Sequence, residues 1–283
     1  MEFVLAKGQN SKFKTIDING LSVGRPHPPR IMGILNLSPE SPYKPSIYSD
    51  VSNAVGRIEQ MIEQGADIID IGLSSANRKI KPLDEKEEMR RLDFAIQIIN
   101  EVQNGAIFSV ETRYARVAEE ALENGWDMVN DICGFADPEM PKVCEKYDAA
   151  VVKMAGSGRL DQPGALDRID DIYADLQQGL TDKTIIDPAF GGWSENKTLE
   201  TDNETFRRLK EFCELGPPVL ISINRKNFIK EIVGKTTEKA LPGSLAATAI
   251  AVGMGVRVVR THDISETRDA AMVGHIFSSG ELK

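Results

Sequence analysis

Short continuous apolar runs alternate with amphipathic segments along most of the chain, and this alternation constrains the fold more than any other feature. Eight such runs follow Arg30, and their hydrophobicity is continuous rather than alternating, as strands buried on both faces require. The runs cover residues 31–35, 67–71, 106–110, 128–129, 149–154, 184–186, 218–223 and 256–259. Eight strands alternating with about eight helices predict an α/β protein with a (β/α)8 TIM barrel. An open, doubly wound sheet is the structural alternative.

The segments between the runs carry the start and stop signals of helices. Asp84 is expected to cap a helix over residues 84–100, in which apolar side chains recur at helical spacing. Residues 113–124 and 203–215 repeat the pattern, and Gly216 ends the second of these helices. No GxGxxG follows the first strand and no GxxxxGK followed by Ser or Thr occurs anywhere, so a nucleotide-binding fold lacks its usual support.

The first 29 residues differ from the repeats that follow. The apolar stretch 16–21 contains Asn19 and Gly20, a pair typical of hairpin turns, and three prolines between residues 26 and 29 end this piece. We therefore predict a β-hairpin extension over residues 1–29 and a single barrel over residues 30–283.

Composition excludes several classes of protein. The chain has 283 residues, of which 41% are hydrophobic, and its net charge of −9 argues against a nucleic-acid-binding surface. Cys133, Cys144 and Cys213 are widely spaced and form no CxxC pair, so a disulfide framework or zinc site is not expected. The N-terminus has no secretory pattern and no window has the length of a membrane span. We expect a cytoplasmic protein with neither nucleic-acid nor membrane partners.

Polar residues follow several of the apolar runs, at the edge of a barrel where active sites gather. One group consists of Glu111, Asn130, Asp187 and Lys226. Their carboxylates, amide and ammonium can accept from and donate to the edge of a flat heterocycle that is rich in nitrogen. Each has a structural alternative when taken singly: Asp187 before a proline could simply begin a turn, and Asn130 could cap the following helix.

Lys226 has a structural alternative as well. Together with Arg225 it could be the solvated start of a helix. Two positive charges at a helix N-terminus oppose the helix dipole, however, and this placement indicates a negative ligand.

A second group consists of Asn36, Arg260 and His262. One amide and two potential cations suit an anion, with or without a divalent metal. Arg260 and His262 directly follow a buried run, and residues 263–266 begin the next helix, whose N-terminus attracts anions. Alone, the two would be a surface arginine and a loop histidine. Beside the other polar strand ends they predict an oxyanion or phosphate site.

Six segments of the chain carry a family resemblance. In order they are IMGILNLSPES, GADIIDIGLSS, FSVETRYARVAEEALENGWDMVNDI, TIIDPAFG, PVLISINRKNF and GSLAATAIAVGMGVRVVRTHDISETRDA. In this order and at this spacing, from about Arg30 to Phe277, they resemble the dihydropteroate synthases of the pterin-binding barrel superfamily. The first loop, with Tyr43 and Lys44, resembles archaeal members more than bacterial ones.

The resemblance implies a transferase of folate or modified-folate biosynthesis. Its reaction joins 6-hydroxymethyl-7,8-dihydropterin diphosphate to 4-aminobenzoate or a related arylamine and releases diphosphate. By resemblance, Asn36 contacts the diphosphate and its Mg²⁺, while Arg260 and His262 hold the diphosphate. The resemblance also implies that the protein is a homodimer built from helices late in the chain.

The resemblance assigns the remaining site residues by position. The pterin would be bound by Glu111, Asn130, Asp187 and Lys226. The arylamine would be bound by loops that include Ser75, Ala76, Arg78 and Asn224. The residues implied in catalysis are Asn36, Asp187, Lys226, Arg260 and His262.

The chain departs from the family pattern in several places. Glu111 stands where the family usually has Asp, which lengthens the carboxylate arm by one methylene. Residues 38–44 and 75–78 differ from the usual loop sequences, and the segment after Asp187 lacks the usual Gly-Phe-Gly-Lys. The pterin and diphosphate sites are largely retained, whereas the arylamine site is altered.

Two other functions compete with the transferase. A pterin-dependent methyltransferase acting with a corrinoid protein would keep the pterin site but would not need Arg260 and His262. A non-catalytic pterin-binding homologue is favoured by Glu111 and by the altered loops. The barrel alone does not decide between these chemistries.

Overall fold

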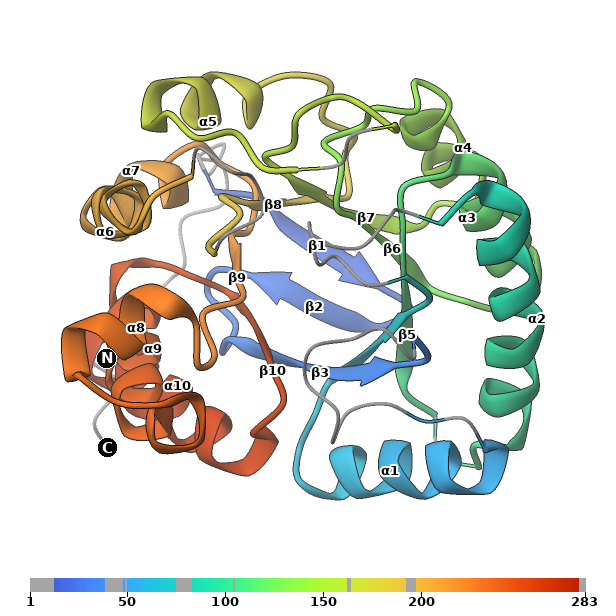
Figure 1. Ribbon diagram of the computed structural model, residues 1–283, viewed down its shortest axis with the longest axis horizontal. Helices are drawn as coiled ribbons and strands as arrows, with labels where there is room; N and C mark the ends of the chain where they lie inside the picture. The colour runs from blue at the N-terminus through green and yellow to red at the C-terminus, as the bar shows by residue number, and fades with distance from the viewer. Residues whose placement is uncertain are drawn as a thin grey trace, which may run out of the picture.

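The strands form a ring surrounded by helices, as the sequence predicts (Figure 1). The computed structural model describes residues 13–38, 48, 50–74, 83–103, 105–161, 164–191 and 197–279. The barrel strands are β3 (Arg30–Asn36), β4 (Ile68–Gly72), β5 (Ile107–Thr112), β6 (Met128–Asp131), β7 (Ala150–Met154), β8 (Thr184–Asp187), β9 (Leu220–Ile221) and β10 (Val258–Thr261).

All paired barrel strands run parallel, in the order β8-β7-β6-β5-β4-β3-β10-β9. A parallel bridge between Ile186 and Val219 joins β8 to the residue before β9, and Ile186 N donates to Pro218 O at 3.0 Å. The two ends of the sheet therefore meet, which confirms the barrel and rules out the open doubly wound sheet. The ladder of β9 is only two residues long, shorter than the six-residue run in the sequence.

The outer helices cover the barrel on all sides in Figure 1. They are α1 (Val51–Glu63), α2 (Glu85–Glu101), α3 (Ala115–Glu123), α4 (Met140–Lys146), α5 (Ile169–Asp175), α6 (Leu199–Arg207), α7 (Leu209–Cys213), α8 (Asn227–Val233), α9 (Leu241–Met254) and α10 (Ile264–Ser279), with a 3-10 turn at Thr237–Lys239. In the described part of the chain, none of the helices combines the length and the apolar character that crossing a bilayer requires.

Local signals explain where the helices begin and end. Asp84 caps α2 through a 2.9 Å bond from Glu87 N, as predicted. The expected helix over 203–215 is instead two helices, because Arg208 interrupts it with non-helical dihedral angles. The first of them begins earlier than predicted, at Leu199, because the Thr198 side chain accepts the N–H of Thr201.

The predicted hairpin is present as β1 (Thr15–Ile18) and β2 (Leu21–Gly24), paired antiparallel. Its buried side chains Ile16, Ile18 and Val23 join the apolar residues that fill the barrel interior at the start of the strands. The interior residues in this layer are Met32, Ile68, Ile107, Met128, Ala150, Val152, Ile185, Leu220 and Val258. The hairpin thus closes the amino end of the barrel and leaves the carboxyl end for polar chemistry.

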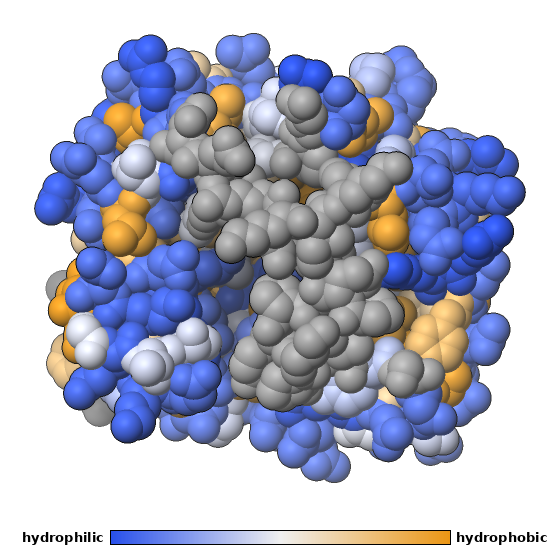
Figure 2. Space-filling model, viewed as in Figure 1, coloured by the Kyte–Doolittle hydropathy of each residue, from blue (hydrophilic) through white to orange (hydrophobic). Residues whose placement is uncertain are grey.

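A second, larger core fills the space between the barrel and its helices, where the outward-facing strand residues meet the apolar helix faces. The described outer surface is mainly hydrophilic on the face drawn in Figure 2, in keeping with the net charge of −9.

Candidate functional site

Strand register brings three predicted site residues together at the carboxyl end of the barrel. Asn36 pairs with Gly72, Gly72 with Glu111, and Glu111 with Asn130, across four neighbouring strands. A Cβ at position 72 would lie 2.9 Å from Asn36 Oδ1 and 3.6 Å from Glu111 Oε1. Glycine at position 72 therefore allows the Asn36 amide and the Glu111 carboxylate to approach each other.

Asp70 lies one layer deeper and is fully buried. Its carboxylate accepts three side-chain donors: Ser109 Oγ at 2.6 Å, Asn130 Nδ2 at 2.9 Å and Arg260 Nε at 2.7 Å. The sequence analysis missed this residue because it lies within an apolar run. The available signal was a carboxylate between Ile69 and Ile71, since such a group inside a buried strand needs polar partners.

Arg260 connects this layer to the mouth of the barrel. While its Nε binds Asp70, another guanidinium nitrogen lies 2.6 Å from Glu111 Oε2. One positive charge thus serves two buried carboxylates. Burial raises the pKa of Glu111 to about 7, against the lowering effect of Arg260, and the nearby Asp70 raises it further.

Asp187 and Lys226 approach the same region from β8 and from the start of α8. Asp187 is buried, and its Oδ1 accepts Ala189 N at 2.7 Å, so it does form the turn that its sequence context suggests. Burial raises the pKa of Asp187 to about 6. The Ala189 N–H and the charges of Lys197, Lys226 and Arg260 act in the opposite direction and lower it. Burial, followed by Arg260, lowers the pKa of Lys226 to about 8. Both groups can change charge near neutral pH.

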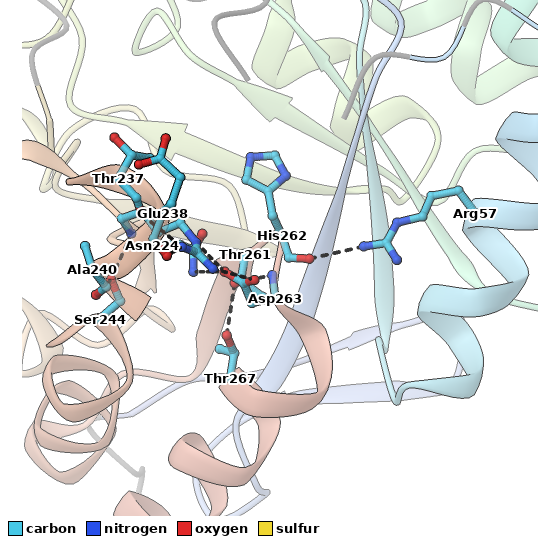
Figure 3. Close-up of polar contacts among 11 residues, drawn as sticks. Arg57, Asn224, Thr237, Glu238, Ala240, Ser244, Thr261, His262, Asp263 and Thr267 are labelled. Atoms are coloured by element: carbon cyan, nitrogen blue, oxygen red, sulfur yellow. Dashed lines mark hydrogen bonds and ion pairs between the residues drawn. The ribbon is translucent and has the colours of Figure 1, made fainter. Parts of the chain in front are cut away.

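His262 follows β10 and is half-buried. In Figure 3 its ring points away from Asp263 and Thr267, while its carbonyl oxygen accepts the Arg57 guanidinium at 3.1 Å. Burial, and next the charge of Arg260, lower the pKa of the imidazole to about 3. Without a bound anion this low pKa keeps His262 neutral near pH 7, whereas the sequence suggested a potential cation.

Arg225 and Asn224 form a separate network beside the site through Asp263, and Figure 3 labels Asn224 and Asp263 in it. The Arg225 guanidinium binds Asp263 through two contacts of 2.8 and 3.0 Å and donates to the carbonyl oxygens of Thr237 and Glu238. Asn224 Nδ2 donates to the same Asp263 carboxylate at 3.0 Å. Asp263 thus balances the Arg225 charge, and of the two positive charges at the start of α8 only Lys226 still supports the suggestion of a negative ligand there.

Three of the predicted arylamine residues, Ser75, Ala76 and Arg78, lie outside the described residues. Lys153, at the end of β7, points away from the barrel axis. Its ammonium donates to Asp175 O at 2.6 Å and to Gln178 O at 3.0 Å, behind the barrel wall.

A family model described as pterin binding enzyme matches residues 32–262, which includes every barrel strand except the start of β3. The chain belongs to the pterin-binding enzyme family. Its relatives include a dihydropteroate synthase from Clostridium beijerinckii, 34% identical over 257 residues that cover 87% of this chain and 93% of the relative. A dihydropteroate synthase from Haemophilus influenzae is 31% identical over 87% of this chain and 92% of its own.

Solved structures of this pterin-binding family agree. The dihydropteroate synthase of Coxiella burnetii in complex with pteroic acid has a TM-score of 0.78 at 29% identity, covering 90% of this chain and 94% of that one. The enzyme of Xanthomonas albilineans with 4-aminobenzoic acid has a TM-score of 0.76 at 28% identity, covering 95% and 98%. The predicted family, barrel fold and dihydropteroate synthase-like transferase class are confirmed.

Proposed function

We propose that this pterin-binding enzyme condenses 6-hydroxymethyl-7,8-dihydropterin diphosphate with 4-aminobenzoate or a related arylamine and releases diphosphate. The observation that carries the proposal is the convergence of Asn36, Glu111 and Asn130 at the carboxyl end of the barrel. Asp187 joins them from the end of β8, and the charge of Arg260 acts on both Glu111 and Asp187. The family membership and the dihydropteroate synthase relatives support the same reaction.

In the proposal, Glu111, Asn130, Asp187 and Lys226 bind the pterin ring. Asp70 supports this role for Asn130, because a carboxylate can only accept and so takes the amide nitrogen at 2.9 Å. The Asn130 carbonyl oxygen is then the group available to receive an N–H from the heterocycle. Asp187 and Glu111 bring carboxylates to the same ring, where Lys226 can donate.

Asn36, Arg260 and His262 would bind the diphosphate. During reaction the carbon–oxygen bond of the ester breaks and its electron pair leaves with the diphosphate. Arg260 and His262 stabilise that negative charge, and a bound diphosphate raises the low pKa of His262. The carboxylates of Asp187 and Glu111 stabilise the positive charge that develops on the pterin methylene. The arylamine nitrogen forms the new carbon–nitrogen bond and loses its proton to water, so no protein nucleophile is needed.

Magnesium fits this site as an ion held mainly by substrate. Asn36 offers one amide oxygen at the mouth of the barrel, and among the described residues no group of three or more His, Cys, Asp or Glu side chains could hold a metal ion. Mg²⁺ commonly binds proteins through one or two oxygen ligands and completes its shell with water and phosphate. Asn36 would be the protein ligand, and the bound ion would neutralise charge on the diphosphate.

The arylamine would bind against the loops after β3 and β4, including Ser75, Ala76 and Arg78, with Asn224 at the border of the site. Asn224 is held by Asp263, so its contribution is to shape the pocket rather than to move toward the ligand. The altered sequence of these loops leaves the identity of the arylamine as part of the proposal.

A homodimer is proposed from the exposed apolar residues late in the chain. Ile250 of α9 is 54% exposed, and Val273 and Phe277 of α10 are 52% and 72% exposed. The two helices pack closely at Gly274, where a Cβ would lie only 2.3 Å from Ala249 O. We also propose a cytoplasmic location, which the three free, buried cysteines support.

The test is diphosphate release on mixing the purified protein with the pterin diphosphate and a panel of arylamines. Release with 4-aminobenzoate supports the simple form of the reaction, and release only with a bulkier aniline supports a variant substrate. Asp187→Asn should abolish release, whereas the exposed Asp182→Asn should not affect it.

A non-catalytic pterin-binding role is the second candidate, because Glu111 and Asp70 already neutralise the Arg260 charge. Pterin binding without release for any arylamine would favour that role. Transfer of a methyl group from a methylated pterin to a corrinoid protein would instead favour the methyltransferase, which has no use for His262 and Arg260 as diphosphate ligands.

A further inference from the structure

The turn that follows β8 is held by a buried ion pair that no sequence motif singled out. The side chains of Lys197 and Asp202 are 0% and 3% exposed, and Lys197 Nζ lies 3.7 Å from Asp202 Oδ1. Thr198 caps α6, so Lys197 precedes the cap and Asp202 is the fourth helical residue. An apolar pair often packs between these two positions at the start of a helix. A buried charge pair in their place costs desolvation free energy, which further hydrogen bonds must offset.

The pair makes such hydrogen bonds to backbone groups of the turn. Lys197 Nζ donates to Ala189 O and, at 3.4 Å, to Pro188 O. Both Asp202 carboxylate oxygens lie 3.1 Å from Gly191 N. The pair thus fixes carbonyl and N–H groups along residues 188–191, within a turn where Ala189 has a positive φ of 61°.

The same turn borders two titratable groups of the site, Asp187 and Lys226. Asp187 begins it, and the Asp187 carboxylate accepts Ala189 N at 2.7 Å. Gly191 ends it, and a Cβ there would lie 3.1 Å from Lys226 Nζ. A shift of this turn would therefore move the Asp187 carboxylate and would alter the space beside the Lys226 ammonium.

We propose that Lys197 and Asp202 are positioning residues that hold the 187–191 turn so that Asp187 and Lys226 present their charges to the heterocycle. The inference rests on the proposed function for its ligand. Neither residue touches that ligand in the proposal, and both act through the turn and through their own charges.

The charge environment makes the proposal testable by pH. Asp187 is influenced by Lys197, Lys226 and Arg260, all of which favour its ionised form. Lys226 is influenced by Arg260, which disfavours its charge, and by Asp187, Asp202 and Glu111, which favour it. Pterin affinity should fall at low pH as Asp187 is protonated (the acid limb) and at high pH as Lys226 loses its proton (the basic limb). Removing the Lys197 charge should move the acid limb to higher pH. Removing the Asp202 charge should move the basic limb to lower pH.

The experiment compares Lys197→Met with Lys153→Met in the full chain. Lys153 is a matched control, because it is also a buried lysine that donates to two carbonyl oxygens and pairs with an aspartate, Asp175, but it faces away from the barrel axis. Dissociation constants for the pterin diphosphate are measured by calorimetry between pH 5 and pH 9. We expect Lys197→Met to weaken binding about tenfold at pH 5 and less than about twofold at pH 8.5, and Lys153→Met to stay within about twofold throughout.

Two further variants extend the test. Lys197→Arg keeps the charge and should restore the acid limb, while Asp202→Asn keeps an acceptor for Gly191 N and should shift only the basic limb. A Lys197→Met profile parallel to wild type, with equal loss at every pH, would reduce the pair to a structural role and overturn the proposal. So would unchanged affinity at all pH values.

A direct measurement separates this inference from the proposed function. Carbon-13 NMR of the Asp187 carboxyl, assigned with Asp187→Asn, follows its titration without ligand. We expect an upward shift of at least about half a pH unit in Lys197→Met and none in Lys153→Met. If wild type binds no pterin diphosphate, the proposed function fails, and this titration still decides whether Lys197 acts on Asp187.

Discussion

Arg260 Nε lies 2.7 Å from Asp70 Oδ2, although the two residues are 190 positions apart in the chain. The contact exists because β3 pairs with β10 on one side and with β4 on the other, so inward side chains of the three strands meet at the axis. Asp70 also accepts donors from β5 and β6. A single carboxylate thus fixes side chains from three other strands beneath the proposed pterin.

Asp70→Asn should destabilise the protein by about 3–5 kcal/mol, because it leaves a buried guanidinium with one fewer anionic partner. Asp182→Asn is the control, since Asp182 is exposed and solvent screens its pair with Lys14, so its loss should leave the stability nearly unchanged. Urea unfolding at pH 7 measures both changes. Equal, small losses in the two variants would show that the Asp70 network contributes little to stability.

Glu111→Asp should preserve or improve pterin affinity. The shorter arm withdraws the carboxylate from Arg260, whose guanidinium nitrogen now lies 2.6 Å from Glu111 Oε2, and it makes room beside Asn36. Calorimetry with the free pterin and with its diphosphate measures both effects. A collapse of pterin affinity would mean that the Glu111–Arg260 pair is required to form the binding surface.

The repeating part of this fold could be predicted from the sequence because unbroken apolar runs and helix caps are local signals. Asp84, for example, predicted the start of α2 because its side chain caps that helix. The convergence of Asn36, Glu111 and Asn130 followed once the runs were taken as parallel strands of one barrel.

The partners of each charged side chain could not be predicted, since they depend on register and on side-chain direction. Arg225 and Lys226 are neighbours in sequence, yet one is bound to Asp263 and the other lies beside Gly191. Lys153 lies near the carboxyl end of β7, as the site residues do on their strands, but it points outward. Asp70 and Lys197 went unnoticed because neither stands at a predicted strand end.

Asp131 should give the stability an unusual dependence on pH. It is fully buried, and burial raises its pKa to about 7 from 3.8, although the N–H of Cys133 at 2.6 Å favours the charged form. The folded state therefore holds the proton more tightly than the unfolded state. The contribution is fully present below pH 3.8 and is lost as the pH rises through about 7.

Asp131→Asn removes this loss, so the variant should match wild type near pH 4 and exceed it above pH 7, by up to about 4 kcal/mol. Unfolding free energies from urea titrations between pH 4 and pH 8.5 provide the measurement. Asp148→Asn, at an exposed position, should leave the profile unchanged. A parallel offset at all pH values would mean that Asp131 is ionised throughout.

Phe277→Glu should convert the proposed homodimer to a monomer, because it places a charge within the apolar surface of α9 and α10, where Phe277 is 72% exposed. Sedimentation velocity over a range of concentrations measures the change. Leu199→Glu, on α6, is the control and should not alter assembly. A wild-type chain that sediments as a monomer at all concentrations would contradict the proposal.

The Arg225–Asp263 pair should be strongly coupled, and a second pair in the chain provides its control. Arg225 and Asp263 are 14% and 19% exposed, with two nitrogen–oxygen contacts of 2.8 and 3.0 Å. Arg159 and Asp161 make the same two-contact arrangement, at 3.2 and 2.9 Å, but are 56% and 69% exposed.

Double-mutant cycles with alanine should therefore give a coupling of about 1–3 kcal/mol for the first pair and no resolvable coupling for the second, which solvent screens. The cycle also cancels the separate loss of the bonds from Arg225 to Thr237 O and Glu238 O, which occurs in both variants that lack Arg225. Equal couplings in the two pairs would show that burial does not strengthen this contact. The Arg225 network would then be held mainly by its carbonyl bonds rather than by charge.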